Sequence, residues 1–380
     1  RHLDHIYHAS FDETGRRVAT AGADRLVKVW DLAGASARVN EWEEESLVQA
    51  LAYSPDGKLL AYGMRNGKVI VRDKTSGKVI LDGPLEHGGE VVFTLFSPES
   101  DRLLSTGFGG GAKLWDLSSG NVIHEFEHDD SINFALFNRM GNRLITASRD
   151  RTAVIWNLET GEPTLPPVQH NYSVVNAGFS AGGREFATAS SDNSVYVWNA
   201  LSGELVRGPF RTGYTLGRPA FDAVGERFVA LVSANSARVF SLGDGHALSN
   251  EMAHRDSIRY LSFDQRGGRV VTTSDDHTAR VWDAWGGDPL SPPLKHKGAV
   301  SYAEFSEDNH QLLTIGLDET AKLWSVRNGA PLTPPMEHSD HVSMGRLHGQ
   351  TESLLTVSSN RVIQWGLGGD RRLKDVLVRE

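Results

Sequence analysis

The chain has 380 residues, a formal net charge of −9 and no cysteine. The lack of cysteine excludes disulfides, zinc–thiolate sites, iron–sulfur clusters and cysteine nucleophiles, and the negative charge disfavours nucleic acid as a partner. No apolar run is long enough to cross a membrane, and the chain opens with RHLDHIYHAS, without a methionine or a signal peptide. We therefore expect a segment lacking its N-terminus, from a cytoplasmic protein that binds no membrane.

A repeat with a period of 41 to 43 residues runs through the chain without an interrupting linker. Its clearest marker is one column, aromatic in every unit but the second, which is filled by Trp30, Arg72, Trp115, Trp156, Trp198, Phe240, Trp282, Trp324 and Trp365. Nine contiguous units predict a single domain over residues 1–380. Five residues after this column stands a glycine in most units, from Gly77 to Gly329, which predicts a turn with positive φ.

Each unit predicts four short β-strands, and unit four shows the pattern best. Residues 132–137 read INFALF, residues 142–148 read NRLITAS, residues 152–158 read TAVIWNL and residues 162–168 read EPTLPPV. Such runs, rich in β-branched and aromatic residues and separated by turn residues, are typical of antiparallel strands. Proline cannot donate to a strand ladder, so we expect the fourth run at the outer edge of its sheet. The final RRLKDVLVRE predicts the outer strand of unit nine.

Three polar columns accompany the tryptophan, and five units fill all four positions. These sets are His2, Thr20, Asp24 and Trp30; His128, Thr146, Asp150 and Trp156; His170, Thr188, Asp192 and Trp198; His254, Thr272, Asp276 and Trp282; and His296, Thr314, Asp318 and Trp324. A buried tryptophan N–H needs an acceptor; a threonine hydroxyl accepts it and bonds onward to a histidine, which the aspartate orients. The same residue types make a nucleophilic triad, but an enzyme does not need five copies, so we assign a structural role.

Units two and six depart from these columns. Unit two carries Glu44, Tyr62, Asn66 and Arg72, and unit six carries Thr212, Ala230, Ala234 and Phe240. We therefore expect both units to lack the polar connection between the tryptophan column and the loop that enters the unit.

The period, the tryptophan column and the endings WD, WN and WS, as at Trp30, Trp156 and Trp324, resemble WD40 repeats over essentially the whole chain. The resemblance implies an all-β WD40-type β-propeller of four-stranded antiparallel blades, in which the polar columns are the structural tetrads. We expect one ring of nine blades; the alternative is a ring of seven or eight blades with spare repeats. The segments PLSPPLKH and PLTPPMEH look like the bacterial branch of the family, which often sits beside a signalling domain such as a Ser/Thr kinase.

The resemblance implies a non-catalytic scaffold for a protein or peptide partner, with no cofactor and no metal, as a regulatory or sensor domain of a larger bacterial signalling protein. In a four-stranded meander, the loop entering the first strand and the turn joining strands two and three lie at one end, which we name the top face. Loops on a rigid scaffold often carry binding sites. We predict a binding site among the variable tips Arg149, Arg151, Asn171, Tyr172, Asn193, Tyr214, Arg218, Arg255, Asp256 and His277.

Two alternatives remain open from the sequence. The first is a propeller enzyme with its site in the central channel, using His8, Asn176 and Arg218, the polar exceptions on predicted first strands that are otherwise mostly apolar or small. The second is a sensor of nucleic acid or anions through Arg149, Arg151, Arg255 and Lys297, which the net charge disfavours. Trp42 and Trp285 lie outside the tryptophan column. An exposed tryptophan marks a contact position, and the alternative is a ring that folds down onto its own blade.

Overall fold

The computed structural model describes residues 2–12, 17–31, 38–74, 76–180, 182–211, 220–222, 225–306, 308–338, 342–348, 353–358, 361–366 and 372–375. Within these ranges the regular structure is 36 β-strands, arranged as nine four-stranded sheets. Each sheet is one sequence repeat, so the predicted all-β class with propeller blades is confirmed. That part of the chain holds no helix with the length and apolar character needed to span a lipid bilayer. Closure of the nine blades into one ring, within a single domain, stays a prediction.

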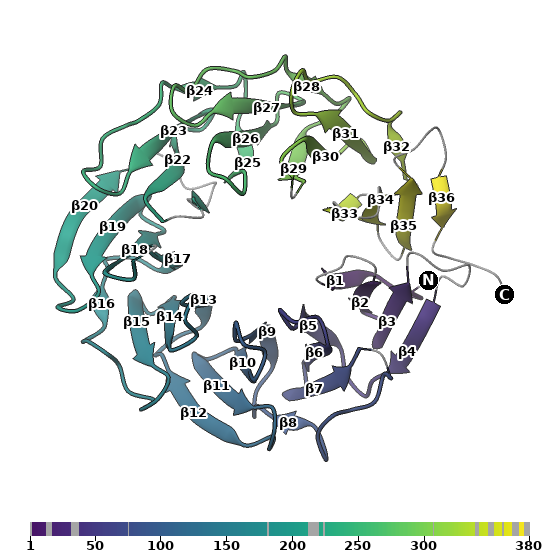
Figure 1. The fold of residues 1–380 in the computed structure, drawn as a ribbon, viewed down its shortest axis with the longest axis vertical. Coiled ribbons are helices and arrows are strands. Elements are labelled where there is room, and N and C mark those ends of the chain that lie inside the picture. Colours follow the sequence, from purple (N-terminus) through teal and green to yellow (C-terminus); the bar gives the residue numbers. More distant parts are fainter. Residues whose placement is uncertain are drawn as a thin grey trace. The chain divides into compact units, whose positions relative to one another are not determined.

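The chain divides into two compact units, and the first contains blades one to four, Arg1–Gln169, with Ser359–Ile363 and Lys374–Glu380. Its strands are β1 (Ile6–Phe11), β2 (Arg17–Gly22), β3 (Leu26–Asp31), β4 (Arg38–Glu43), β5 (Val48–Tyr53), β6 (Leu59–Met64), β7 (Lys68–Asp73), β8 (Leu85–Glu86), β9 (Val91–Phe96), β10 (Arg102–Gly107), β11 (Gly111–Asp116), β12 (Val122–Glu127), β13 (Ile132–Phe137), β14 (Arg143–Ser148), β15 (Thr152–Asn157) and β16 (Val168–Gln169). Each blade is an antiparallel meander of consecutive strands, and β5 packs against β1 and β9 of its neighbours (Figure 1).

The second unit spans His170–Ser358 and Gln364–Leu373. Blades five to eight are formed by β17 (Val174–Phe179), β18 (Glu185–Ser190), β19 (Ser194–Asn199), β20 (Leu205–Arg211), β21 (Ala220–Phe221), β22 (Arg227–Ser233), β23 (Ser236–Ser241), β24 (Met252–Ala253), β25 (Ile258–Phe263), β26 (Arg269–Ser274), β27 (Thr278–Asp283), β28 (Leu294–Lys295), β29 (Val300–Phe305), β30 (Gln311–Gly316), β31 (Thr320–Ser325) and β32 (Met336–Glu337). The ninth sheet has β33 (Val342–His348), β34 (Ser353–Ser358), β35 (Arg361–Gly366) and β36 (Arg372–Asp375), the last of which lies in the predicted outer segment.

Apolar side chains fill the space between the faces of neighbouring blades. In the second unit, Val271 and Val281 of blade seven pack with Val300, Phe305 and Leu312 of blade eight, and all five are buried. The first unit repeats this between blades two and three. Within each unit, a blade thus depends on its neighbour to cover its apolar face, as expected for a stacked repeat.

The tryptophan column lies in the third strand of each blade, and the proline-rich runs shape the fourth. Trp156 in β15 makes an isolated bridge to Pro163, and the outer strand then resumes only as the two residues of β16. Blade three has no proline in its fourth run, and its outer strand β12 extends over six residues. The predicted edge position is therefore correct, and in blade four Pro166 and Pro167 precede the paired residues of β16 instead of lying among them.

Two turn positions impose a left-handed backbone. The predicted glycine column is confirmed, because Gly77, Gly120, Gly161, Gly203, Gly245, Gly287 and Gly329 have φ between 69° and 79°. The turn joining strands two and three imposes the same conformation on non-glycine tips, at Arg25, Arg151, Asn193, His277 and Glu319, with φ from 60° to 74°. A β-carbon makes this conformation costly, and the turn therefore fixes where these side chains project.

Candidate functional site

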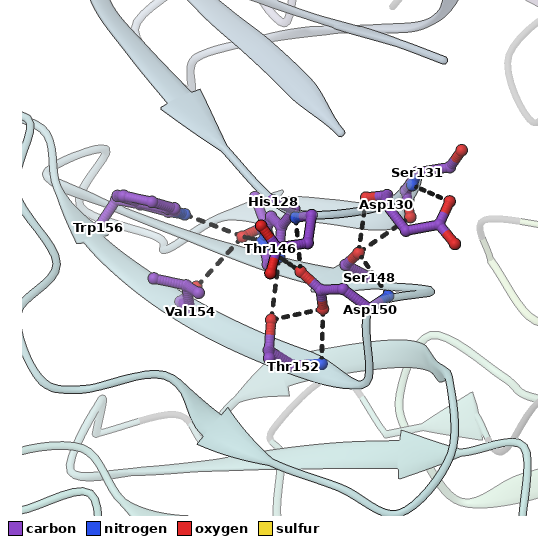
Figure 2. Close-up of polar contacts among 10 residues, drawn as sticks. His128, Asp130, Ser131, Thr146, Ser148, Asp150, Thr152, Val154 and Trp156 are labelled. Carbon is purple, nitrogen blue, oxygen red and sulfur yellow. Dashed lines mark hydrogen bonds and ion pairs between the residues drawn. The ribbon is translucent and has the colours of Figure 1, made fainter. Parts of the chain in front are cut away.

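The polar columns form a continuous chain of hydrogen bonds in the regular blades. In blade four, Trp156 Nε1 donates to Thr146 Oγ1 at 2.9 Å, and His128 Nε2 lies 2.7 Å from the same oxygen (Figure 2). His128 Nδ1 then lies 2.8 Å from the Asp150 carboxylate. Blades one, seven and eight repeat these bonds. The tetrad therefore ties the third strand to the loop that enters the blade.

The aspartate of a regular blade has its acceptor capacity filled by the fold. Asp276 accepts hydrogen bonds from His254 Nδ1 at 3.0 Å, Arg255 N at 3.0 Å, Thr278 N at 2.9 Å and Thr278 Oγ1 at 2.5 Å. Burial alone would raise the pKa of Asp276, but these bonds outweigh it and lower the pKa to about 2. Burial also lowers the pKa of His254 and keeps its ring neutral. Such a carboxylate has no spare lone pair for a ligand.

Blade two replaces the tetrad with a different polar connection, so the prediction that it lacks one is wrong. Tyr62 Oη donates to Glu44 Oε1 at 2.5 Å, and Arg72 binds both, through Nε to Tyr62 Oη at 2.7 Å and through Nη2 to Glu44 Oε1 at 3.1 Å. The Trp42 ring lies 4.5 Å from the Arg72 guanidinium carbon. Trp42 therefore packs against its own blade, which is the second of the two alternatives that the sequence left open.

Blade six lacks the polar connection in the residues described, as predicted. Phe240 takes the tryptophan position and stacks on Phe228 with ring centroids 5.0 Å apart. Phe210 also stacks on Phe228, with ring centroids 5.9 Å apart. Ala230 is buried at the threonine position, and Thr212 lies outside the described residues. Apolar packing substitutes here for the hydrogen-bonded chain.

Blade five breaks the tetrad at one link, contrary to prediction. Trp198 Nε1 donates to Thr188 Oγ1 at 2.7 Å, and His170 Nε2 lies 2.9 Å from that oxygen, but the buried His170 Nδ1 has no hydrogen-bond partner. The physical reason is Tyr196, whose ring packs edge-on to His170 with centroids 4.6 Å apart and whose hydroxyl donates to Asp192 Oδ2 at 3.3 Å. Burial lowers the pKa of His170 to about 4, so the ring stays neutral.

The displaced Asp192 lines a pocket of about 390 Å³ at the top face of blade five. Asn171 and Tyr172 come from the entering loop, and the other walls are Asp192, Asn193, Ser194, Tyr196 and Pro209. Ser191 N donates to Ser173 O at 2.8 Å, which ties the turn to the entering loop. The pocket therefore combines one carboxylate, two phenol rings and two amides on a hydrogen-bonded frame.

The structure brings three of the ten predicted binding residues together in this pocket, namely Asn171, Tyr172 and Asn193. Arg255, Asp256 and His277 lie instead at the top face of blade seven, where Ser274 Oγ donates to Asp256 O at 2.9 Å. Arg149 and Arg151 are exposed tips of blade four, and their side chains make no hydrogen bond or ion pair within the described ranges. Tyr214 and Arg218 lie outside those ranges.

Sequence reasoning missed Ser194, Tyr196 and Pro209, and it assigned Asp192 to the tetrad. A signal was present in the column two residues before the tryptophan. Blade five has Tyr196 in that column, whereas the other blades have five cations and three aliphatic residues: Lys28, Lys113, Arg238, Arg280, Lys322, Ile70, Val154 and Ile363. A phenol hydroxyl there competes for the neighbouring aspartate, which a cationic or aliphatic residue does not do in the same way.

The residues named for a channel enzyme are not gathered into a described site. His8 in β1 has a buried Nδ1 without a hydrogen-bond partner, and burial lowers its pKa. Asn176 in β17 accepts a hydrogen bond from Ala177 N at 2.8 Å, and Arg218 lies outside the described residues. Across the described residues, no three histidine, aspartate or glutamate side chains group in a way that would hold a metal ion.

Trp285, the other tryptophan outside the column, is 59% exposed, and the Arg227 guanidinium carbon lies 4.3 Å from its ring. The ring therefore covers an arginine that also bonds Asp222 Oδ2 at 2.9 Å.

Two family models match the chain. The model of the WD domain, G-beta repeat, matches residues 1–31, 120–157, 164–199 and 245–283, and the model of the anaphase-promoting complex subunit 4 WD40 domain matches residues 24–95. Each stretch of the first model ends at or just after a third-strand tryptophan of the tetrads described above. The chain belongs to the WD40-repeat family. The tetrad bonds thus have the structural place that this membership implies.

Curated WD40-repeat relatives match parts of the chain. The small ribosomal subunit protein RACK1 of Caenorhabditis elegans is 28% identical over 128 residues, which is 33% of this chain and 38% of that protein. Actin-interacting protein 1 of Drosophila melanogaster is 30% identical over 111 residues, which is 29% of this chain and 18% of that protein. The chain thus spans well under half the length of these relatives.

Among solved structures, the computationally designed Ika8 protein is similar with a TM-score of 0.63 and 19% identity, over 96% of this chain and 97% of that one. At this identity the likeness supports the fold alone.

Proposed function

We propose that this WD40-repeat chain is a non-catalytic scaffold that binds a protein or peptide partner at the pocket of blade five. The observation that carries the proposal is the pocket itself, whose Asn171, Tyr172 and Asn193 are not required by the repeat and stand on tied loops. Tyrosine is favoured in binding hot spots, and Tyr172 is 59% exposed, so a partner has apolar area to bury there. An actin-interacting protein and a ribosomal subunit protein among the relatives support such a role.

Narrower features belong to the same proposal. The partner is a protein or peptide and neither a membrane nor nucleic acid, which the net charge of −9 supports. We also propose a cytoplasmic regulatory or sensor domain of a larger bacterial signalling protein, which rests on the proline-rich segments such as PLSPPLKH. Reading the coding sequence upstream of Arg1 tests this point, because a kinase or another signalling domain there is the expected finding.

A displayed peptide library, panned on the whole chain, tests the binding role without knowledge of the source cell. We expect enriched peptides to bind the wild type and to lose about tenfold or more in affinity with Tyr172→Ala, as for a hot-spot residue. Leu201→Ala is the matched control, because Leu201 is 76% exposed on the turn at the other end of the same blade. Failure of any peptide to enrich contradicts the proposal, as does equal binding to wild type and Tyr172→Ala.

The double variant Arg149→Ala/Arg151→Ala decides between blades. Unchanged binding of the selected peptides is expected when the site lies on blade five. Loss of binding in this variant, with Tyr172→Ala unaffected, would move the site to blade four.

A further inference from the structure

We propose that the pocket of blade five takes a cationic side chain of the partner, an arginine or a lysine. This inference rests on the proposed function, because it names the chemistry of the group that enters the same site. Its basis is a carboxylate with few hydrogen bonds from the fold, the aromatic rings beside it, and the absence from blade five of the cation that five other blades have in the column of Tyr196.

The Asp192 carboxylate has spare acceptor capacity. Among the described residues it accepts only from Ser194 N at 3.0 Å and Tyr196 Oη at 3.3 Å. The equivalent Asp276 accepts four hydrogen bonds, and two of them come from a histidine ring and from the backbone of the entering loop. A carboxylate offers about four lone-pair sites, so Asp192 keeps roughly two of them for a donor that enters the pocket.

Five other blades have a cation in the column where blade five has Tyr196, and the remaining three have Ile70, Val154 and Ile363. Lys322 Nζ lies 5.8 Å from the Trp324 ring centre. Burial lowers the pKa of Lys322, and the negative charge of Asp318 opposes this shift in part. Arg280 lies over Trp282 in the same way at 5.6 Å. In blade five the Tyr196 ring stacks on Trp198 at 5.9 Å instead. Blade five thus has no cation in this column, and a cation from a partner would supply the positive charge beside Asp192.

The remaining walls suit a cation on a long apolar stem. Tyr172 and Tyr196 present phenol rings, which attract cations through their electron-rich faces. The side-chain carbonyls of Asn171 and Asn193 are further acceptors for guanidinium or ammonium protons. No residue that lines the pocket is positively charged. An anionic group would therefore be repelled by Asp192, and an apolar group would bury the Asp192 carboxylate without a partner.

The size of the pocket favours one side chain over a large ligand. Its volume of about 390 Å³ lies near the lower end of the range for ligand sites, which is roughly 300 to 1,000 Å³. Tyr172 at its mouth is 59% exposed, so the backbone of a partner can stay outside while one residue enters.

The test compares two capped tripeptides, acetyl-Gly-Arg-Gly-amide and the same peptide with citrulline, which keeps the shape of arginine without its charge. Binding to the whole chain is followed by saturation-transfer NMR at low and high salt. We expect the arginine peptide to bind about tenfold more tightly than the citrulline peptide, with a preference that falls as salt screens the charge. Equal binding of the two peptides would overturn the inference.

Two variants assign the preference to Asp192. Asp192→Asn keeps the shape and is expected to abolish the preference for arginine, whereas the control Asp276→Asn lowers stability and keeps it. Tyr196→Lys is the second variant, because it introduces the cation that five other blades have in this column and is expected to remove external cation binding in a folded blade. A preference for arginine that survives both Asp192→Asn and Tyr196→Lys would sink the inference.

The outcomes also separate this inference from the proposed function. Library peptides that need Tyr172 but show no preference for arginine or lysine leave the scaffold role standing and refute the cation. Absence of both library binding and the tripeptide preference refutes both.

Discussion

Truncation of the tetrad aspartate is expected to cost far more in a regular blade than in blade five. In Asp276→Ala, His254 Nδ1 loses its carboxylate partner and is left with the Thr278 hydroxyl at 3.2 Å, so the two groups keep one bond between them where both had bonded the carboxylate. Arg255 N and Thr278 N lose an acceptor as well. An unsatisfied buried donor costs about 1 to 3 kcal/mol and each other bond about 1 kcal/mol or less, since Arg255 N is re-solvated. We expect a loss of about 3 kcal/mol in the free energy of unfolding.

In Asp192→Ala, the histidine has no bond to the carboxylate to lose. His170 Nδ1 is already without a partner, and among the described residues the bonds removed are those from Ser194 N and from Tyr196 Oη, which lines the pocket. We expect a cost of about 1 kcal/mol. Urea unfolding followed by tryptophan fluorescence measures both variants, with Asp318→Ala as a second regular blade. Equal losses for Asp192→Ala and Asp276→Ala would refute the account of blade five.

Three further outcomes follow from the same contacts. Arg151→Gly, at φ 74°, should raise the free energy of unfolding by about 0.5 to 1 kcal/mol, while Asn193→Gly, at φ 66°, should change little because asparagine tolerates this backbone; thermal unfolding that ranks them the other way contradicts this. Arg72→Ala should cost about 3 kcal/mol in urea unfolding, because Glu44, whose side chain is 11% exposed, keeps a charge without its cation; a wild-type midpoint would argue that the connection in blade two is dispensable. The free energy of unfolding should fall as the pH drops from 6.5 toward 4, because burial lowers the pKa of His87 and His170 to about 4 and the unfolded chain takes up protons first. The loss for each ring reaches about 3 kcal/mol at the acid end of this range. His170→Gln should therefore flatten the dependence of the urea midpoint on pH.

The sequence predicted the blades because their determinants are local and repeated. The tryptophan column, the turn glycines and the polar columns each recur at a fixed spacing, and the third strands, the positive φ values and the bonds of blades one, four, seven and eight follow from them. Three pocket residues were also found, because Asn171, Tyr172 and Asn193 stand at tips that the repeat leaves free.

What the sequence did not predict depends on side chains from different columns that meet in space. Glu44, Tyr62 and Arg72 each differ from the family residue, and each one alone indicates that the tetrad is lost. Only the distances show that the three side chains replace the tetrad with an ion pair that shares the Tyr62 hydroxyl. Asp192 keeps the family residue and therefore predicted an intact tetrad. The side chain that diverts it, Tyr196, lies in a column with no assigned role.

A repeat that uses the same hydrogen-bonded chain in many blades can release one carboxylate at a tolerable cost in stability. Trp198 and Thr188 still bond in blade five, and the Tyr196 ring packs at right angles to the His170 ring with centroids 4.6 Å apart. The apolar core between blades is independent of that bond, since Val195 and Val197 stay buried beside blade six. One substitution, from a cationic or aliphatic residue to tyrosine, therefore moves Asp192 from the fold to a pocket wall and adds a ring beside it. Because both changes favour a cation, the preference of the pocket for a cationic ligand should depend on Tyr196. Substitutions confined to the loop tips Asn171, Tyr172 and Asn193 should not abolish this preference.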